Sequence, residues 1–267
     1  MPHKLTAQAS RVAVAAGSFY PGSVANLSRT VSGLLASARS GERPGLSAII
    51  VPHAGYVYSG SVAARAFARV PNAKNRFHRC VIVGPSHFVA FNGIAAPSHI
   101  SFATPLGELP VDVDAVQALV SEARVVINDA AHEQDHAIEV ELPFLQAIFG
   151  TVPIVPLLFG LTSARAVAAA IAEVWNDKTL LVVSSDLSHY EDYEAARHRD
   201  RRTAEAIEDF DERAIGPADA CGHLGIRGAL IEAGRRGLAI QRIALCNSGD
   251  TAGDKHSVVG YGAWDFA

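Results

Sequence analysis

The sequence has few cysteines, and they follow no recognisable pattern. Cys80, Cys221 and Cys246 are odd in number, widely separated and outside any CxxC arrangement. Neither a disulfide framework nor a zinc knuckle is therefore expected. We interpret the three cysteines as small apolar side chains of the interior.

Long apolar runs are also absent. The apolar stretches are strand-sized, such as residues 180–183, and none approaches the roughly 20 residues that a membrane-spanning helix requires. The N-terminus has neither the charged start nor the apolar middle of a secretion signal. These absences argue against a membrane partner and predict a cytoplasmic location.

The chain lacks an excess of basic charge. Its formal net charge is -4, and its densest basic stretch, residues 197–202, is interrupted by Asp200 and followed by Glu205 and Glu208. This pattern is typical of a solvated helix face rather than of a surface that neutralises phosphates. Nucleic acid is therefore not expected as a partner.

The composition is that of a compact globular protein. Hydrophobic residues make up 49% of the 267 residues and charged residues 19%, and no linker or internal repeat divides the chain. An α/β fold of this length often forms one unit. We expect a single domain over residues 1–267.

Short apolar runs bounded by Gly, Pro or Ser punctuate the chain. Such runs are typical of strands buried on both faces of a largely parallel sheet. They predict strands at residues 46–51, 79–83, 152–158, 179–183, 242–245 and 257–263.

Segments with helical spacing lie between these runs. They predict helices at residues 24–36, 61–69, 113–122, 138–148, 163–175, 193–207 and 224–236. The alternation predicts an α/β fold with a largely parallel central sheet flanked by helices on both faces. Residues 94–110, rich in Pro, Gly and Ser, are expected to form a hairpin or a loop excursion.

Histidines follow three of the predicted strands. His53 and His87 come just after the first and second strands, and His189 follows the fourth, three residues after Asp186. Ligands of open α/β sheets bind beyond the carboxyl ends of the strands, so these side chains are expected to share one pocket. A single histidine could merely satisfy a loop, but three at strand ends favour a metal or acid–base site.

A further pair, His132 and His136, has the spacing of the HExxH zinc motif. That motif requires both histidines within one helix, whereas here the helical pattern begins only after His136. We therefore interpret the match as accidental. His136 could contribute to the pocket from a helix start or lie in a solvated first turn.

Residues 246–254 form a polar cluster after the fifth predicted strand. The cluster could be an ordinary Gly- and Asp-rich turn. A carboxylate from it, Asp250 first and Asp254 second, could also complete two histidines into the two-His, one-carboxylate set that suits non-haem Fe(II). The sequence leaves both interpretations open.

Several motifs together resemble the Memo family, known in microbes as AmmeMemoRadiSam system protein B. The resemblance runs in order from near residue 11 to the C-terminus. It rests on AGSFYP (16–21), PHAGY (52–56), GPSH (84–87), HAIEV (136–140) with LPF (142–144), SSDLSH (184–189), and the 247–254 loop before VVGY (258–261).

The resemblance implies a fold similar to the class III extradiol dioxygenases, in which two histidines and an acidic residue hold Fe(II). His53 and His87 match the metal-ligand histidines, and His189 matches the acid–base histidine, with Asp186 and His136 beside the pocket. The animal Memo protein is a metal binder that uses two histidines and a cysteine. Thr251 stands at the position of that cysteine, so Asp250 is the candidate third ligand here.

The sequence leaves open whether the protein is an enzyme. One hypothesis is a non-haem Fe(II) dioxygenase acting on an aromatic diol or related small molecule, with His189 moving the proton. The alternative is a non-catalytic regulatory protein that binds a metal such as copper, or a peptide, on the same scaffold. Metal-assisted hydrolysis with zinc is a third class. The family resemblance also implies partners in a radical-enzyme system.

Overall fold

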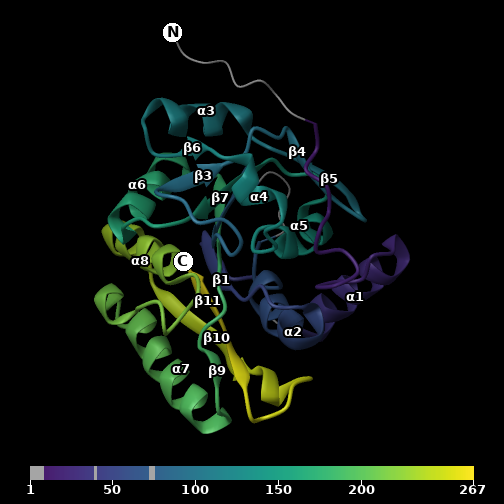
Figure 1. Ribbon diagram of the computed structural model, residues 1–267, viewed down its shortest axis with the longest axis vertical. Coiled ribbons are helices and arrows are strands. Elements are labelled where there is room, and N and C mark those ends of the chain that lie inside the picture. The colour runs from purple at the N-terminus through teal and green to yellow at the C-terminus, as the bar shows by residue number, and fades with distance from the viewer. Residues whose placement is uncertain (1–8, 39–40, 72–75) are drawn as a thin grey trace.

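The structure is a computed structural model that describes residues 9–38, 41–71 and 76–267 (Figure 1). The first eight residues lie outside the described residues. The expectation that the N-terminus is not a secretion signal falls partly on them. The helices are α1 (Val24–Ala38), α2 (Tyr56–Phe67), α3 (Val113–Ser121), α4 (Asp129–Glu133), α5 (Leu142–Phe149), α6 (Ala164–Val174), α7 (Tyr193–Glu208) and α8 (His223–Arg236). Single 3-10 turns are η1 (Glu139–Glu141), η2 (Glu212–Ala214) and η3 (Ser248–Asp250). The strands are β1 (Ala48–Val51), β2 (Arg79–Pro85), β3 (Ile94–Ala96), β4 (Ser101–Thr104), β5 (Gly107–Pro110), β6 (Val126–Ile127), β7 (Ile154–Phe159), β8 (Thr179–Ser184), β9 (His189–Glu191), β10 (Ile240–Asn247) and β11 (Val258–Phe266).

Four parallel strands form the centre of the main sheet, in the order β1-β8-β2-β7. Every residue of β1, β7 and β8 is buried, because both faces of the sheet are covered. This burial explains why the strands read as continuous Val, Ile and Leu runs. Antiparallel neighbours extend the sheet: β11 and β10 lie beyond β1, and β3 lies beside β7.

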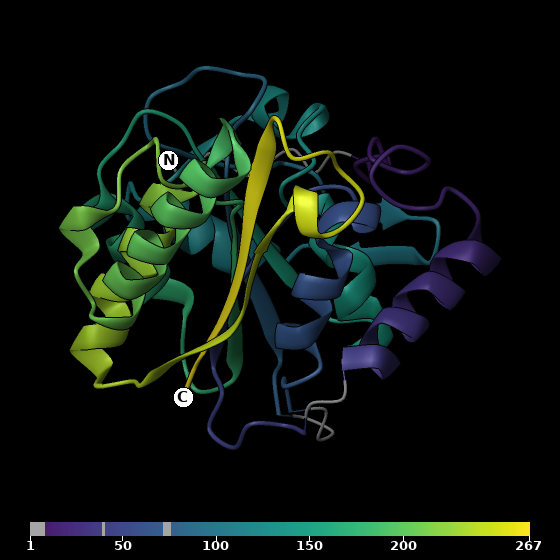
Figure 2. The same cartoon turned by 90° about the horizontal axis from the view of Figure 1, so that it is seen from below.

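Helices cover both faces of the sheet. Figure 2 shows α6, α7 and α8 on one side and α1, α2 and α5 on the other. The arrangement confirms the predicted α/β fold with a largely parallel central sheet flanked by helices. Across the described ranges, no helix is long and apolar enough to cross a membrane.

The predicted elements agree with the structure in type, with one instructive difference. The single helix predicted over residues 138–148 is divided into the 3-10 turn η1 and helix α5, in which Pro143 occupies the first turn. Proline is tolerated there because the backbone N–H that it lacks would have no intrahelical partner. The hairpin or loop excursion expected at residues 94–110 is confirmed: it contains the β4–β5 hairpin, whose turn includes Gly107 at φ 117°.

The parallel register brings the carboxyl ends of β1, β2 and β8 to one edge of the sheet. Val51 lies beside Ser184 at the end of β8, and β2 is the other neighbour of β8. The loops that follow these three strands are therefore adjacent in space, although they are distant in sequence. Open α/β sheets bind ligands at this edge.

Candidate metal site

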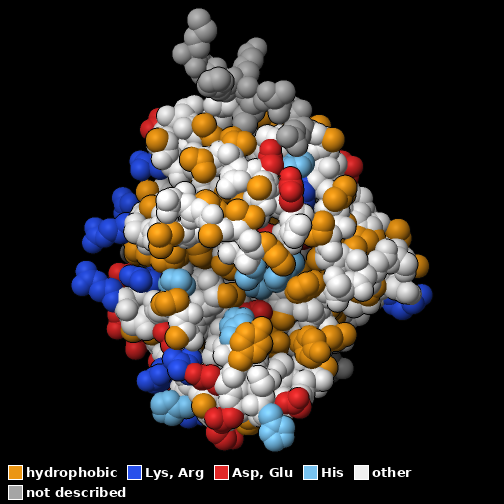
Figure 3. Space-filling model, in the orientation of Figure 1, with side chains coloured by type: hydrophobic (Ala, Val, Ile, Leu, Met, Phe, Trp, Pro, Cys, Tyr) orange, Lys and Arg blue, Asp and Glu red, His pale blue; other side chains and the backbone are white. Residues whose placement is uncertain are grey.

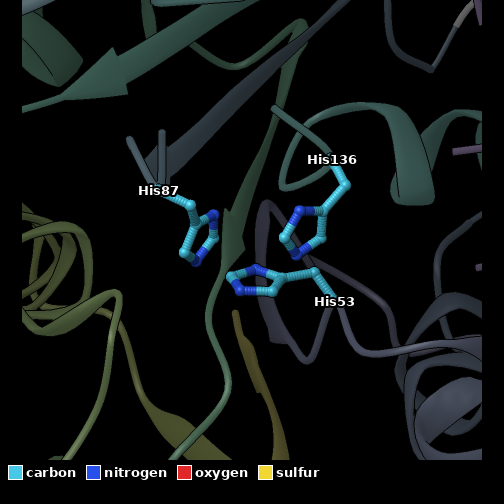
Figure 4. A group of neighbouring side chains, drawn as sticks. All are labelled: His53, His87 and His136. Carbon is cyan, nitrogen blue, oxygen red and sulfur yellow. The ribbon is translucent and has the colours of Figure 1, made fainter. Parts of the chain in front are cut away.

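Three histidines converge beyond the strand ends (Figure 4). His53 follows β1, His87 follows β2, and His136 lies between α4 and η1. Each offers one ligand nitrogen, and these nitrogens all lie within 4.8 Å of one another. The ring centroids of His87 and His136 are 4.6 Å apart, and His53 lies 5.1 Å from the first and 5.4 Å from the second. The structure thus brings His53 and His87 together and adds His136.

His53 is held from the backbone and from its ring. Its backbone N–H donates to Asp186 Oδ1 at 2.9 Å, and its ring Nδ1 lies 2.8 Å from Ser184 Oγ. The Ser184 hydroxyl donates to Ala137 O at 2.7 Å, so Ser184 Oγ accepts from Nδ1–H. The lone pair of His53 is then on Nε2, which lies 3.3 Å from Cys221 Sγ.

His87 is oriented by a buried carboxylate, Asp135. Asp135 accepts from the backbone N–H of His87 at 2.6 Å, faces the ring Nδ1 at 3.2 Å, and accepts from the backbone N–H of Ala137 at 2.9 Å. Burial opposes ionisation of Asp135, but these interactions outweigh it and lower its pKa. A carboxylate behind Nδ1 leaves Nε2 free for a metal, which is the usual arrangement around ligating histidines.

His136 is fixed by stacking. Its ring lies 4.1 Å from the Phe19 ring, at an interplanar angle of 27°, and also stacks on His87. Burial, followed by the proximity of His87, lowers the pKa of His136 to about 4. Burial and the other histidines likewise hold the pKa of His53 well below its usual value. Both rings are therefore neutral at pH 7, which is the form that binds metals.

A buried ionic network secures the segment that carries Asp135 and His136. Arg11 donates to Asp135 O at 2.6 Å and to His132 O at 2.9 Å, and it pairs with Glu139. Glu139 also accepts from the backbone N–H groups of Val14 and Ala15 at 2.9 Å each and from the Tyr20 hydroxyl. The N-terminal segment is thereby joined to the loop beside the strand ends, and Phe19 is placed against His136.

A cavity of about 570 Å³ opens above the histidines. On this face of the molecule, histidine side chains gather in a hollow between apolar side chains (Figure 3). His189 and Asp186 line the same cavity. Other lining residues include Phe19, Ala54, Gly55, Tyr58, Tyr190, Ser248, Gly253, Asp254, Ser257, Val259 and Tyr261.

His189 has the geometry of a proton acceptor. Its Nδ1 lies 2.8 Å from Leu187 O and so carries the hydrogen, which leaves Nε2 with a free lone pair. Burial lowers the pKa of His189, so the ring is neutral at pH 7. Burial raises the pKa of the neighbouring Asp186 to about 7.

The structure separates the two candidate carboxylates of the C-terminal loop. Asp250 accepts from the Tyr193 hydroxyl at 2.5 Å and from Asn247 N at 3.1 Å, closing a capping box around η3. It lines a different cavity, together with Asp200. It does not belong to the group of neighbouring ligand atoms that the three histidines form. Asp254 lines the histidine cavity and accepts from His256 N at 2.8 Å.

The remaining histidine of the HExxH-like stretch, His132, lies outside the group. It is 1% exposed within α4, and its Nε2 lies 3.2 Å from Ala95 O.

Sequence reasoning missed Asp135, although it stands beside His136 in the same polar stretch. It also treated Cys221 as a packing residue, whereas Cys221 Sγ contacts a ring nitrogen of His53.

The donor set fits a divalent transition metal. Imidazole nitrogens suit zinc, copper, iron and nickel. In addition, His136 Nδ1 is buried without a hydrogen-bond partner among the described residues. His132 Nδ1, outside the cluster, is likewise buried without a partner among the described residues, so the fit of a metal rests on the convergence of the three imidazoles.

The fold and the histidine cluster define an α/β protein with a candidate metal site at the carboxyl ends of its parallel strands. A family model described as "Memo-like protein" matches residues 11–264. The chain therefore belongs to the Memo family.

Several curated relatives support this assignment. A MEMO1 family protein of Nitrosopumilus maritimus is 31% identical, with 96% of this chain and 99% of the relative covered. One from Thermotoga neapolitana is 35% identical over 94% of this chain and 97% of the relative. The crystal structure of an uncharacterized protein from Escherichia coli K12 shares the fold, with a TM-score of 0.52 and 13% identity over 81% of this chain and 99% of that chain.

Proposed function

We propose that the protein binds one divalent metal ion through His53, His87 and His136 and acts as a non-haem Fe(II) dioxygenase on an aromatic diol or related small molecule. The convergence of the three imidazoles at the base of one cavity carries the proposal. We propose His136, rather than the Asp250 that the sequence suggested, as the third ligand, because Asp250 caps η3 and lines another cavity.

An Fe(II) ion, when bound, would supply the oxygen chemistry that no side chain of the site possesses. The protein's own residues would orient the ligand and move protons. His189 Nε2 would accept the proton of a ligand hydroxyl, since Nδ1 is committed to Leu187 O. A positioned base of this kind contributes about 100-fold or more to a rate.

A second candidate is metal-assisted hydrolysis. Three histidines are also the protein ligands of one class of catalytic zinc site, in which a bound water completes the coordination. The all-nitrogen donor set favours this candidate, and His189 would again serve as the base. We propose partners in a radical-enzyme system on the family assignment alone.

The test begins with elemental analysis of protein purified without added metal. Anaerobic loading with Fe(II) is then followed by oxygen uptake with a panel of catechols, for the unaltered protein and for His53→Ala, His87→Ala and His136→Ala. Each variant should lose both metal and uptake, whereas His189→Ala should keep the metal and lose at least about 100-fold in uptake.

The outcomes separate the candidates. Tight metal binding without uptake on any catechol would refute the dioxygenase proposal and leave a metal-binding regulatory role. Zinc at one equivalent with esterase activity that depends on His189 would favour hydrolysis. Stoichiometric metal in His136→Ala would remove His136 from the ligand set.

A further inference from the structure

Tyr190 has an unusual backbone conformation. Its φ is 61°, in the left-handed region that bulky side chains rarely adopt, and its side chain is 78% exposed. The other non-glycine residues with positive φ in the described part of the chain are Ala123 and Phe210. The exposed ring of Tyr190 gains little from burial in the free protein to offset this conformation.

The neighbouring strand holds Tyr190 in place. On either side of it, His189 pairs with Val259 and Glu191 pairs with Val258, and the register of β9 against β11 shifts between these two pairs. Such irregularities re-aim side chains and are frequent beside functional sites. Here the result is that Tyr190 lines the histidine cavity, with its ring centroid 5.7 Å from that of His189.

The other walls of the cavity are rich in rings. Phe19, Tyr58 and Tyr261 line it together with the histidines, so a flat aromatic ligand would meet ring faces and edges on several sides. A strained residue that the fold retains without benefit to the free protein points to a role toward a ligand. We propose that Tyr190 is a specificity-determining residue that contacts an aromatic ring bound in the histidine cavity.

The class of ligand, an aromatic ring, is taken from the proposed function, so the inference rests on that proposal. Its test measures binding and stability and does not require catalytic turnover. Binding of 4-nitrocatechol to the Co(II)-loaded protein is measured spectroscopically without oxygen, and stability is measured as the midpoint of urea unfolding. The variants are Tyr190→Gly, which removes both the strain and the ring, and Tyr190→Phe, which keeps the ring. Ala123→Gly is the matched control, because it relieves a positive φ outside the cavity.

Tyr190→Gly should raise the unfolding midpoint and weaken 4-nitrocatechol binding about 3- to 10-fold, the effect of losing one ring contact. Tyr190→Phe should bind like the unaltered protein. Ala123→Gly should not weaken binding.

Unchanged binding in Tyr190→Gly would overturn the inference, as would a lowered midpoint or failure of the unaltered protein to bind the probe. Binding that depends on Tyr190 without oxygen uptake by the Fe(II) form would support the inference and refute only the proposed activity. Oxygen uptake that is indifferent to Tyr190→Gly would refute only the inference.

Discussion

Replacement of Glu139 by alanine should destabilise the protein severely. Glu139 is fully buried, and its two carboxylate oxygens accept hydrogen bonds from Arg11, Tyr20 and two backbone N–H groups. Arg11 is itself only 2% exposed, so removing its partner leaves a guanidinium charge in the interior. Breaking a buried pair from one side costs about 3–5 kcal/mol. A loss of that size is a large fraction of the about 5–15 kcal/mol that stabilises a typical domain.

Urea unfolding gives the measurement, because both tryptophans report on it. Trp175 is 2% exposed and Trp264 is fully buried, so unfolding transfers both indoles to water and changes their fluorescence. Glu194→Ala is the control, since Glu194 pairs with Arg197 on the exposed surface of α7. It should cost less than about 1 kcal/mol.

A double-mutant cycle with Arg11→Met tests the reasoning further. If the cost of Glu139→Ala is mainly the unpaired charge of Arg11, the double variant should lose clearly less stability than the sum of the two single variants. A cost below about 1 kcal/mol for Glu139→Ala, or strict additivity, would show that the network contributes little.

Three other predictions follow from the same structure. Asp135→Asn should weaken Co(II) binding about 10- to 100-fold, because it replaces the carboxylate that orients His87; unchanged affinity in a metal titration would contradict this role. Burial raises the pKa of Asp200 from 3.8 to about 6, so the folded state binds that proton more tightly than the unfolded chain. Stability should therefore fall as the pH rises from 3.8 toward 6, and Asp200→Asn should flatten this fall in urea unfolding at a series of pH values; an identical pH profile would refute the assignment. Gly222→Ala should cost about 1–3 kcal/mol, because its Cβ would lie 2.4 Å from the Ser185 Cβ. Gly33→Ala, within α1 and with nothing within 4 Å of the new Cβ, should instead stabilise by about 0.5–1 kcal/mol, and equal effects of the two changes would contradict the packing argument.

The strands that could be predicted from the sequence are those in which every residue is buried. The runs that became β1, β7 and β8 are buried on both faces, so their apolar character could not be mistaken for a half-exposed element. By contrast, β9 has three residues, none of them buried, and among the described strands it pairs with β11 alone. Nothing in its composition distinguishes it from a loop, because its pairing is set by distant residues.

The residues of the candidate site likewise fall into those that the sequence could place and those that it could not. His53 and His87 each stand two residues past the end of a strand, and the sheet topology brings such positions together. Asp250 lies in the short 3-10 turn η3, where the direction of its side chain depends on local hydrogen bonds. Asn247 and Asp250 have the spacing of a capping box, and the structure contains that capping box. The same residues were therefore compatible with a helix cap as well as with a metal ligand.

His136 and Asp135 show what local pattern leaves open: it offered His136 as either a pocket residue or a solvated one, and it did not single out Asp135. Their positions depend on Arg11, which reaches across more than 120 residues of sequence to His132 O and Asp135 O. The same N-terminal segment places Phe19 on the His136 ring. A buried ion pair thus joins the beginning of the chain to the segment that brings the third histidine to the strand ends. It follows that the stability of this network and the affinity of the metal site should change together when Arg11 or Glu139 is altered.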